Sequence, residues 1–370
     1  MAKPIRVLQV IGQMNRGGAE SMIMNIYRNI DRSVVQFDFV EHYQQEASYD
    51  QEIYKLGGRI YRCPRFNTSN IIKYVLWWKT FFEKEGREYR IIHGHIGSTA
   101  SIYLEIAKQN GLFTIAHSHG VFNQINVKNL EYYILSFPTR YIADYCIGCS
   151  KDALVSRFGK KRALNREKSS VLKNGININN FKYDQEKHEM IRKELGIIDK
   201  KVIGHVGRFD KVKNHSFLID IFDEIIKKND DYVLLLVGDG DQRTAIENRI
   251  HQLRLEQSVL MTGMVSNVQD YINAMDIIAF PSLSEGLPVS LIEAQANGIP
   301  IVLSNRVSAE VKLNPNVFFL DLDKGKEVWA DSIIDNIGKR INDPSKALKE
   351  GGYDINLVAK ELQSFYCNHV

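Results

Sequence analysis

Two glutamates eight positions apart form the most informative pattern in the sequence. Glu285 and Glu293 lie in the segment 281–300, which follows a short apolar run. The order of residues there predicts a loop and then a helix, with Pro288 in the first helical turn and Gly298 just past the last one. A helix that starts at the carboxyl edge of a sheet offers unpaired N–H groups and the positive end of its dipole, and both favour a bound diphosphate.

The chemistry expected of this segment is recognition of a nucleotide-diphosphate sugar. The backbone around Gly286 and Leu287 would hold the diphosphate. Carboxylates accept hydrogen bonds from vicinal hydroxyls, so Glu293 is expected to bind a ribose and Glu285 the sugar to be transferred. The competing interpretation is that these are two surface glutamates on a capped helix.

A second segment supplies two cations. Arg208 and Lys213 follow the apolar run 201–206, and Asn214 after them is a favourable cap for the next helix. Guanidinium and ammonium groups form charge-assisted hydrogen bonds to phosphate, which suits a diphosphate leaving group. Basic residues in one loop are common by chance, but two cations and two carboxylates that converge on one sheet edge are not.

Parallel strands joined by crossover helices are needed to position these residues. Short apolar runs alternate with amphipathic stretches along the whole chain, which is the pattern of α/β folds. The expected strands are 5–11, 36–41, 58–61, 90–93, 112–116, 145–148 and 169–172 in the first half, and 201–206, 232–237, 258–262, 277–280, 299–303 and 317–320 in the second. The sequence therefore predicts an α/β protein with two Rossmann-like, doubly wound parallel sheets.

The length of 370 residues indicates two domains, because single hydrophobic cores stop growing near 250 to 300 residues. The segment 178–191 is polar and expected to be poor in helix, so the boundary is placed near Asn180. The predicted domains are 1–179 on the acceptor side and 180–354 for the nucleotide sugar. A helix is expected in 355–370, and the sequence leaves its docking partner open.

Charge is unevenly distributed along the chain. Residues 1–180 contain 25 Lys and Arg against 15 Asp and Glu, and the remainder contains 23 against 29. A basic first half could face an anionic membrane or acceptor, or it could be an ordinary solvated surface. No nucleic-acid motif is present. The apolar window 71–82, with Trp77, Trp78 and Phe81, either contacts lipid or forms helix core.

No apolar run approaches the length of a spanning helix, and no secretory signal is recognisable, so a cytoplasmic protein is expected. Contact with the inner face of the membrane, as a peripheral protein, stays open. Cys146 and Cys149 form a C-x-x-C pair, but no second pair completes a zinc site, so they are expected to be structural.

Other residue pairs resemble metal ligands only superficially, and no metal or other cofactor is expected. They are Asp239 with Asp241, His93 with His95, and His117 with His119. The aspartates open a helix, where carboxylates favour the N-terminus. The histidines of each pair are expected to point to alternate faces, which would allow only one of each pair to reach a given site.

The motifs together resemble the retaining family-four, or group 1, glycosyltransferases of the two-domain GT-B fold, in which the domains face each other across a cleft. The resemblance rests on G-R-x₄-K-N at 207–214, L-V-G-D-G at 236–240 and E-G-L-P with a second glutamate eight residues later at 285–300. The last of these is the most specific. The stretch 305–310 departs from the family, many members of which have a Gly-Gly pair before a glutamate there, so Glu310 is left out of the site.

The resemblance implies roles for individual residues. It implies Arg208 and Lys213 on the diphosphate, Glu285 on the donor sugar and Glu293 on the ribose. Three further positions complete the predicted site: the loop at Gly17 and Gly18 close to the phosphates, His117 near the reacting carbon, and backbone near Val265 at the base.

The implied activity is that of a hexosyltransferase. It would move a sugar with retention, and without a metal, from a nucleotide-diphosphate sugar, with a UDP-sugar expected. The implied acceptor is a saccharide or lipid-linked saccharide in capsule or exopolysaccharide synthesis. An epimerase of the same fold and a catalytically inactive binding or regulatory subunit are the alternatives. A nicotinamide oxidoreductase is disfavoured because Gly12 is followed by Gly17 and Gly18 and not by G-x-G-x-x-G.

Overall fold

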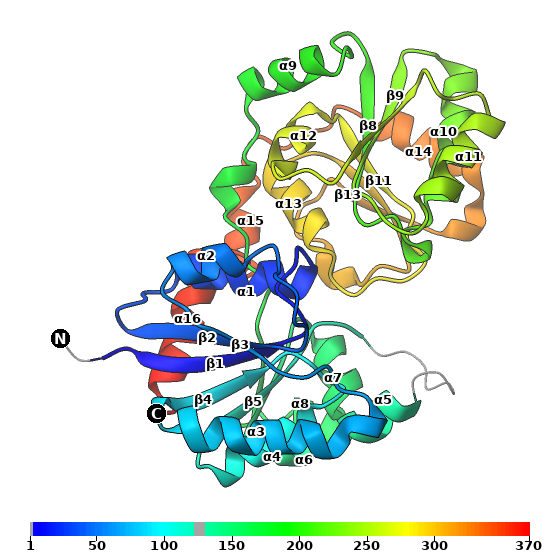
Figure 1. Ribbon diagram of the computed structural model, residues 1–370. Coiled ribbons are helices and arrows are strands. Elements are labelled where there is room, and N and C mark those ends of the chain that lie inside the picture. Colours follow the sequence, from blue (N-terminus) through cyan, green and yellow to red (C-terminus); the bar gives the residue numbers. More distant parts are fainter. Residues whose placement is uncertain (1–2, 122–129) are drawn as a thin grey trace. The chain divides into compact units, whose positions relative to one another are not determined.

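The structure, a computed structural model, describes residues 3–121 and 130–370. The chain forms two compact units (Figure 1). Unit 1 comprises Met1–Gly175 together with Ile355–Val370, and unit 2 comprises Ile176–Asp354. The chain thus enters unit 2 just after Gly175, where the sequence analysis placed the boundary near Asn180, and returns to unit 1 for its last helix.

Unit 1 is built on a seven-stranded parallel sheet in the order β3-β2-β1-β4-β5-β6-β7. Its strands are β1 (Ile5–Ile11), β2 (Val35–Glu41), β3 (Ile60–Arg62), β4 (Tyr89–Gly94), β5 (Phe113–Ser118), β6 (Tyr145–Gly148) and β7 (Ser169–Val171). Its helices are α1 (Gly18–Asn29), α2 (Asp50–Lys55), α3 (Ile71–Glu85), α4 (Ala100–Gln109), α5 (Leu130–Ser136), α6 (Thr139–Ile142), α7 (Lys151–Phe158), α8 (Lys160–Ala163) and α16 (Ile355–Cys367). All seven predicted strands of the first half are present.

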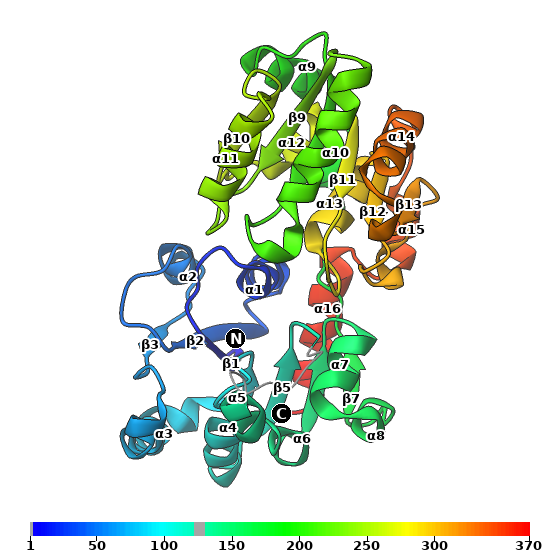
Figure 2. The ribbon, with the colours of Figure 1, turned by 90° about the vertical axis from the view of Figure 1, so that its right-hand side faces the viewer.

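Helices cover both faces of this sheet, so its central strands are buried on both sides. In β1, Val7 and Ile11 pack into a core with α1, α2 and α16, whereas Leu8 and Val10 pack into a second core with α3, α4 and α7 (Figure 2). Successive side chains of a strand point to opposite faces, which explains the division. Odd-numbered positions of β1 therefore face α16.

Unit 2 repeats this architecture with a six-stranded parallel sheet in the order β10-β9-β8-β11-β12-β13. Its strands are β8 (Lys201–Val206), β9 (Tyr232–Val237), β10 (Val259–Gly263), β11 (Ile277–Phe280), β12 (Ile301–Ser304) and β13 (Val317–Leu320). Its helices are α9 (Gln185–Glu194), α10 (His215–Lys228), α11 (Arg243–Gln252), α12 (Val268–Ala274), α13 (Val289–Asn297), α14 (Lys326–Asn336) and α15 (Ser345–Glu350). The predicted fold class and all six strands of the second half are confirmed.

One expectation about the linker is wrong. The segment 178–191 was expected to be poor in helix, but α9 begins at Gln185, with the Asp184 carboxylate accepting the backbone N–H of Lys187 at 3.1 Å. Its few apolar residues still reach the core, since Ile191 is buried. A short, mostly solvated helix carries too weak an apolar stripe to be recognised by periodicity.

The aromatic window of the first half belongs largely to the core. Trp78 and Phe81 of α3 are buried and stack on the rings of Phe82 and Trp77, respectively, which supports the core interpretation for both. The exposed apolar residues of this helix are instead Ile71, Ile72 and Leu76, of which Ile72 is 74% exposed. Among the described residues, no helix is both long enough and apolar enough to cross a membrane.

The end of α13 gives a prediction for stability. Gly298 has φ of +78°, and a Cβ there would lie 2.2 Å from the carbonyl oxygen of Ile341, whereas Gly338 has φ of +77° and open space around it. Gly338→Ala is expected to cost about 1 kcal/mol for the left-handed backbone alone. Gly298→Ala adds a backbone clash, so it should cost clearly more.

Urea unfolding of both variants measures the difference. Equal costs for Gly298→Ala and Gly338→Ala would contradict the packing described for Gly298, since both residues have the same backbone conformation.

Candidate active site

In unit 2 the predicted site residues gather where the strand order reverses. The chain proceeds from β8 to β9 and β10 on one side and from β11 to β12 and β13 on the other, so β8 and β11 flank the switch point. Both strands are parallel, and the loops that follow them leave the same carboxyl edge. Open α/β sheets bind ligands at this place.

The loop after β8 brings Lys213 to this edge. Lys211–Lys213 form a 3₁₀ turn in which the carboxylate of Asp210 accepts the backbone N–H of Lys213 at 3.1 Å. Asn214 follows in the left-handed conformation, with φ of +58°. Its side chain does not cap α10, contrary to the prediction, but donates to the carbonyl of Pro281 at 3.1 Å. Asn214 therefore ties the loop after β8 to the loop after β11.

Lys213 and Glu285 form an ion pair between these two loops. Lys213 Nζ lies 2.7 Å from Glu285 Oε1 and 4.5 Å from the centre of the Phe280 ring. The side chains are only 13% and 19% exposed. Partial burial strengthens the pair relative to a surface ion pair, and the aromatic face adds a second attraction for the ammonium group.

The Glu285 loop is also held from its other side. The N–H of Glu285 donates to the carbonyl of Arg306 at 3.3 Å, and the carbonyl of Glu285 accepts from the N–H of Ser308 at 3.1 Å. The stretch 305–310, in which the sequence departs from the family pattern, therefore supports the predicted sugar-binding loop through its backbone. Glu310 lies in the short turn Ala309–Val311 after it.

The start of α13 offers the predicted N–H groups. Pro288 is the N-cap residue, one position before the first turn where it was expected. The backbone N–H groups of Gly286, Leu287 and Val289 have no hydrogen-bond acceptor within the described part of the chain. These groups lie directly after Glu285, and a diphosphate could accept from them.

Glu293 lies one and a half turns further along α13. Burial raises the pKa of its carboxyl to about 7, although part of the side chain remains accessible. A partly protonated carboxyl at neutral pH can both donate to and accept from hydroxyl groups. This environment is suited to a neutral, hydroxyl-rich partner such as a ribose.

The other predicted residues of unit 2 stand nearby without joining the ion pair. Arg208, in the loop after β8, is exposed and forms no ion pair with a residue that the structure describes. Val265 follows β10 and is half-buried. Asp239 accepts from the Arg243 guanidinium at 3.1 Å and from the N–H of Gly240 at 2.8 Å, so its carboxylate is occupied locally.

In unit 1 the predicted residues lie after β1, which flanks the switch point between β1 and β4, and at the end of β5. Gly17 is the N-cap of α1, and a Cβ on it would lie 2.3 Å from a carboxylate oxygen of Glu20. Gly18 has open space around it, so the fold of unit 1 does not itself require glycine there. His117, at the end of β5, is buried, and its Nδ1 lies 3.2 Å from Nε2 of His93.

The expectation for the histidine pairs is wrong. His93 and His95 stack with ring centres 4.4 Å apart, and His117 and His119 stack at 4.2 Å. Residues two positions apart share one face of a strand, so each pair points the same way. The ligand atoms of His93, His95 and His117 lie within 4.8 Å of one another, and among the described residues this group alone could hold a metal ion.

Sequence reasoning also missed Gln9 and Tyr366, which contact this group. Nε2 of His95 lies 2.8 Å from Oε1 of Gln9, and Nδ1 of His93 lies 2.7 Å from the Tyr366 hydroxyl. A polar residue at an inward-facing position of the buried strand β1 was the available signal for Gln9. The sequence contains no comparable signal for Tyr366, because the position of this residue depends on the return of α16 to unit 1.

Comparison with known proteins finds relatives of the whole chain. The sequence profile of the family described as "Glycosyl transferases group 1" matches residues 187–337. The Bacillus subtilis (strain 168) protein EpsF, named as a glycosyltransferase, is 33% identical over 339 residues, which cover 89% of this chain and 86% of EpsF. The "Capsular polysaccharide biosynthesis glycosyltransferase CapH" of Staphylococcus aureus is 26% identical over 98% of both chains.

Solved structures show the same fold. The Anabaena protein HepE in complex with UDP-glucose superposes with a TM-score of 0.80 at 18% identity, over 98% of this chain and 100% of that one. The lipopolysaccharide glycosyltransferase WaaG superposes with a TM-score of 0.69 at 16% identity, over 98% and 95%. With the GT-B fold and a relative at 33% identity over most of its length, the chain belongs to the group 1 glycosyltransferases.

Proposed function

We propose that the chain transfers a sugar from a UDP-sugar to a saccharide or lipid-linked saccharide of a cell-surface polysaccharide. The observation that carries the proposal is the Lys213–Glu285 ion pair at the switch point of unit 2, beside the open N–H groups that start α13. One partner is a cation suited to a diphosphate, and the other is an acceptor suited to sugar hydroxyls.

The choice of donor and product class is supported by the named relatives. HepE binds UDP-glucose in its crystal structure, and CapH is named for capsular polysaccharide synthesis. Both proteins match nearly the full length of this chain. A UDP-sugar and a capsule-type or exopolysaccharide-type acceptor are therefore the first to be tested.

The mechanism follows from where negative charge develops. Cleavage of the glycosyl phosphate bond leaves extra charge on the diphosphate, and Lys213 and the N–H groups of Gly286 and Leu287 would stabilise it. The carboxylate of Glu285 would accept from hydroxyls of the transferred sugar and so fix its position. Arg208, which is exposed in the loop after β8, would be the second cation to contact the diphosphate.

We propose transfer that retains the anomeric configuration and needs no metal ion. Retention rests on the family resemblance: the acceptor would attack on the face that the diphosphate leaves, and the leaving oxygen would take the acceptor proton. Lys213 and the helix start would supply the positive charge that a divalent ion supplies in other transferases.

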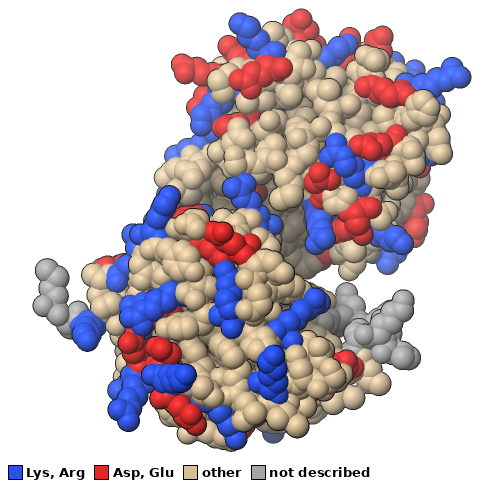
Figure 3. Space-filling view, viewed as in Figure 1, with Lys and Arg blue, Asp and Glu red and all other residues tan. Residues whose placement is uncertain are grey.

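A cytoplasmic location with peripheral contact to the inner membrane face is proposed from the surface of α3. Ile72 and Leu76 are exposed on this helix, and Lys73 and Lys79 lie exposed beside them. Figure 3 shows Lys and Arg side chains spread over the displayed face of unit 1, with a few groups of Asp and Glu among them. Exposed apolar residues flanked by lysines favour an anionic lipid surface.

The division of labour between Lys213 and Glu285 can be tested by binding. Lys213→Ala is expected to weaken binding of both UDP and a UDP-sugar by roughly 10-fold or more, because it removes a charge-assisted contact to the diphosphate. Glu285→Ala should weaken only the UDP-sugar. Each variant should lower transfer by roughly 100-fold or more.

Calorimetric titration with UDP and UDP-glucose, and then with other UDP-sugars, provides the measurement. Lys227→Ala, which removes an exposed lysine and its ion pairs with Asp223 and Glu224 on α10, is the matched control. Unchanged binding and full activity in both site variants would refute the proposed site.

Glu293 gives a prediction for pH dependence. Its pKa is raised from 4.5 to about 7 in the folded protein, so the unfolded chain loses this proton first as pH rises. The contribution of Glu293 to the free energy of unfolding must then fall between about pH 4.5 and pH 7. Glu293→Gln should therefore become more stable relative to wild type as pH rises from 5 to 8, while binding UDP more weakly.

Thermal unfolding at pH 5 and pH 8 measures this effect, with the exposed Glu361→Gln as the control. A constant difference between Glu293→Gln and wild type across this range would show that Glu293 is not held in a desolvating environment.

Liposome flotation tests the membrane contact. Wild-type protein is expected to float with vesicles that contain phosphatidylglycerol at low salt, and Ile72→Glu with Leu76→Glu should abolish this. Ile198→Glu, at an exposed apolar position of unit 2, is the control. Absence of binding by the wild type at low salt would remove the membrane from the proposal.

A further inference from the structure

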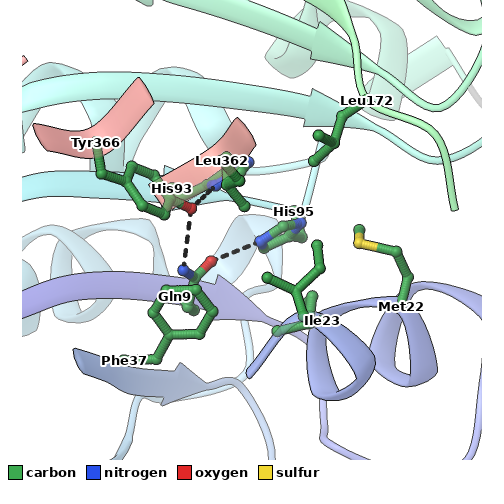
Figure 4. A pocket seen from close by; sticks show the side chains of 10 residues that line it. Gln9, Met22, Ile23, Phe37, His93, His95, Leu172, Leu362 and Tyr366 are labelled. Atoms are coloured by element: carbon green, nitrogen blue, oxygen red, sulfur yellow. Dashed lines mark hydrogen bonds between the residues drawn. The ribbon is translucent and has the colours of Figure 1, made fainter. Parts of the chain in front are cut away.

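A buried polar cluster in unit 1 is organised around one side-chain amide. The cluster consists of His93, His95, His117, His119, Gln9 and Tyr366. Gln9 and Tyr366 are at most 1% exposed, and they line, together with His93 and His95, a small cavity of about 10 Å³, which has room for roughly one water molecule (Figure 4). All four rings lie on the α16 side of the sheet.

Two chains of hydrogen bonds leave the Gln9 amide. Its Nε2 lies 3.4 Å from the Tyr366 hydroxyl, which lies 2.7 Å from Nδ1 of His93, and Nε2 of His93 lies 3.2 Å from Nδ1 of His117. Its Oε1 lies 2.8 Å from Nε2 of His95, and Nδ1 of His95 lies 2.8 Å from Nε2 of His119. Figure 4 shows the two ends of the amide facing the two chains.

The chemistry of neutral imidazole determines the donor-to-acceptor direction of the hydrogen bonds in both chains. Each neutral ring has one N–H donor and one acceptor nitrogen. Burial holds the pKa values of all four imidazoles well below the usual value, to about 3 for His93 and about 4 for His119, so the rings are neutral at pH 7.

The amide orientation then determines where every proton lies. The amide N–H donates to Tyr366, whose hydroxyl donates to Nδ1 of His93, so Nε2–H of His93 donates to His117. On the other chain, Nε2–H of His95 donates to the Gln9 oxygen, so its Nδ1 accepts from Nε2–H of His119. All four rings consequently carry their proton on Nε2.

A reversed amide would move all four protons together. The Gln9 oxygen would then accept from Tyr366, and every hydrogen bond along both chains would change direction. The four rings would all be protonated on Nδ1. In either orientation the four histidines share one tautomer.

The two chains of hydrogen bonds end in ring nitrogens of opposite character, one a donor and the other an acceptor. Nε2 of His117 and Nδ1 of His119 are buried and have no hydrogen-bond partner among the described residues. With a shared tautomer, one of these two atoms is an N–H donor and the other is an acceptor.

We propose that Gln9 is a positioning residue that gives the four histidines one shared tautomer, so that His117 and His119 together recognise a ligand hydroxyl group. The two rings stack with their centres 4.2 Å apart, and a hydroxyl placed between their free nitrogens would donate to one and accept from the other. A phosphate or carboxylate, which only accepts, leaves the acceptor nitrogen unpaired at a cost. The assignment of this hydroxyl to a sugar substrate rests on the proposed function.

The tautomers can be observed without any substrate. Long-range ¹H–¹⁵N spectra of the full chain labelled with ¹⁵N-histidine distinguish the Nε2–H and Nδ1–H forms of each ring. The wild type should show the four cluster histidines in the Nε2–H form at pH 7, and a common Nδ1–H form would also support the proposal. Mixed tautomers within the cluster would overturn it.

Gln9→Glu is the most informative variant, because a carboxylate accepts hydrogen bonds but cannot donate them. Both His95 and the Tyr366 hydroxyl must then donate to it, which leaves His95 and His119 protonated on Nε2 but forces His93 and His117 to Nδ1. The two free nitrogens become acceptors together. Tyr366→Phe releases the His93 and His117 chain alone and should leave the tautomers of His95 and His119 unchanged.

Met22→Leu, which lines the same cavity without a polar contact, controls for altered packing and should keep the wild-type pattern. A wild-type pattern in Gln9→Glu would show that Gln9 does not direct the protons. Loss of the imidazole N–H signals on addition of Zn²⁺ to the wild type would assign the cluster to a metal and overturn the proposal.

Kinetics with UDP-glucose and its monodeoxy analogues test the recognition step. Gln9→Glu should lower kcat/KM by about 10-fold for UDP-glucose, the scale of one unsatisfied buried group, and Met22→Leu should not. One deoxy analogue should react equally with wild type and Gln9→Glu, because it lacks the hydroxyl in question. An equal loss with every analogue would contradict recognition of a hydroxyl.

The two proposals fail separately. A shared tautomer in a protein that binds no nucleotide sugar refutes only the proposed function. Mixed tautomers in an active enzyme refute only the inference about Gln9.

Discussion

The parallel pairing of β8 with β11 is the constraint on which the predicted donor site depends. These strands are far apart in the sequence, yet their pairing places the loops after residues 206 and 280 at one edge of the sheet. Asn214 and the backbone of Leu283 then fix the loops to each other. Lys213 and Glu285, which are 72 positions apart in the sequence, thereby become neighbours without long flexible segments. Charges that are already in place need little reorganisation during the reaction.

Both units hold polar side chains in a mostly apolar environment. In unit 2 the Lys213 ammonium is balanced by Glu285 and by the face of Phe280. In unit 1 the four imidazoles form two hydrogen-bonded pairs, one linked to Tyr366 and the other to Gln9. Unpaired charge or unpaired polar atoms would be costly at such depths, so the hydrogen-bonded geometry is strongly determined.

Much of the fold could be predicted from the sequence because the signals were local. Every expected strand is present, since buried parallel strands are short apolar runs between turn residues. The segment 281–300, which contains Glu285 and Glu293, was recognised for the same reason, because its loop, helix start and Gly298 follow one another directly in the sequence. The helix α9 was missed because most of its surface is solvated.

The rest depended on contacts between distant segments. Asn214 was expected to cap a helix, but its amide binds the carbonyl of Pro281, which no local pattern reveals. The two histidines of each pair were expected on opposite faces of a strand, but residues two positions apart lie on the same face, and the rings stack. The partners of His93 and His95 come from β1 and α16, at opposite ends of the chain, so only the tertiary structure brings them together.

The return of α16 to unit 1 has a consequence for biosynthesis. Ile355, Val358, Leu362 and Tyr366 fill the same core as the residues of β1 and α1. Unit 2 is continuous in sequence, whereas unit 1 is assembled from two segments that flank it. Unit 1, although its sheet is translated first, stays without part of its interior until the final helix emerges. The core of unit 1 is therefore expected to be completed only after the whole of unit 2 has been synthesised.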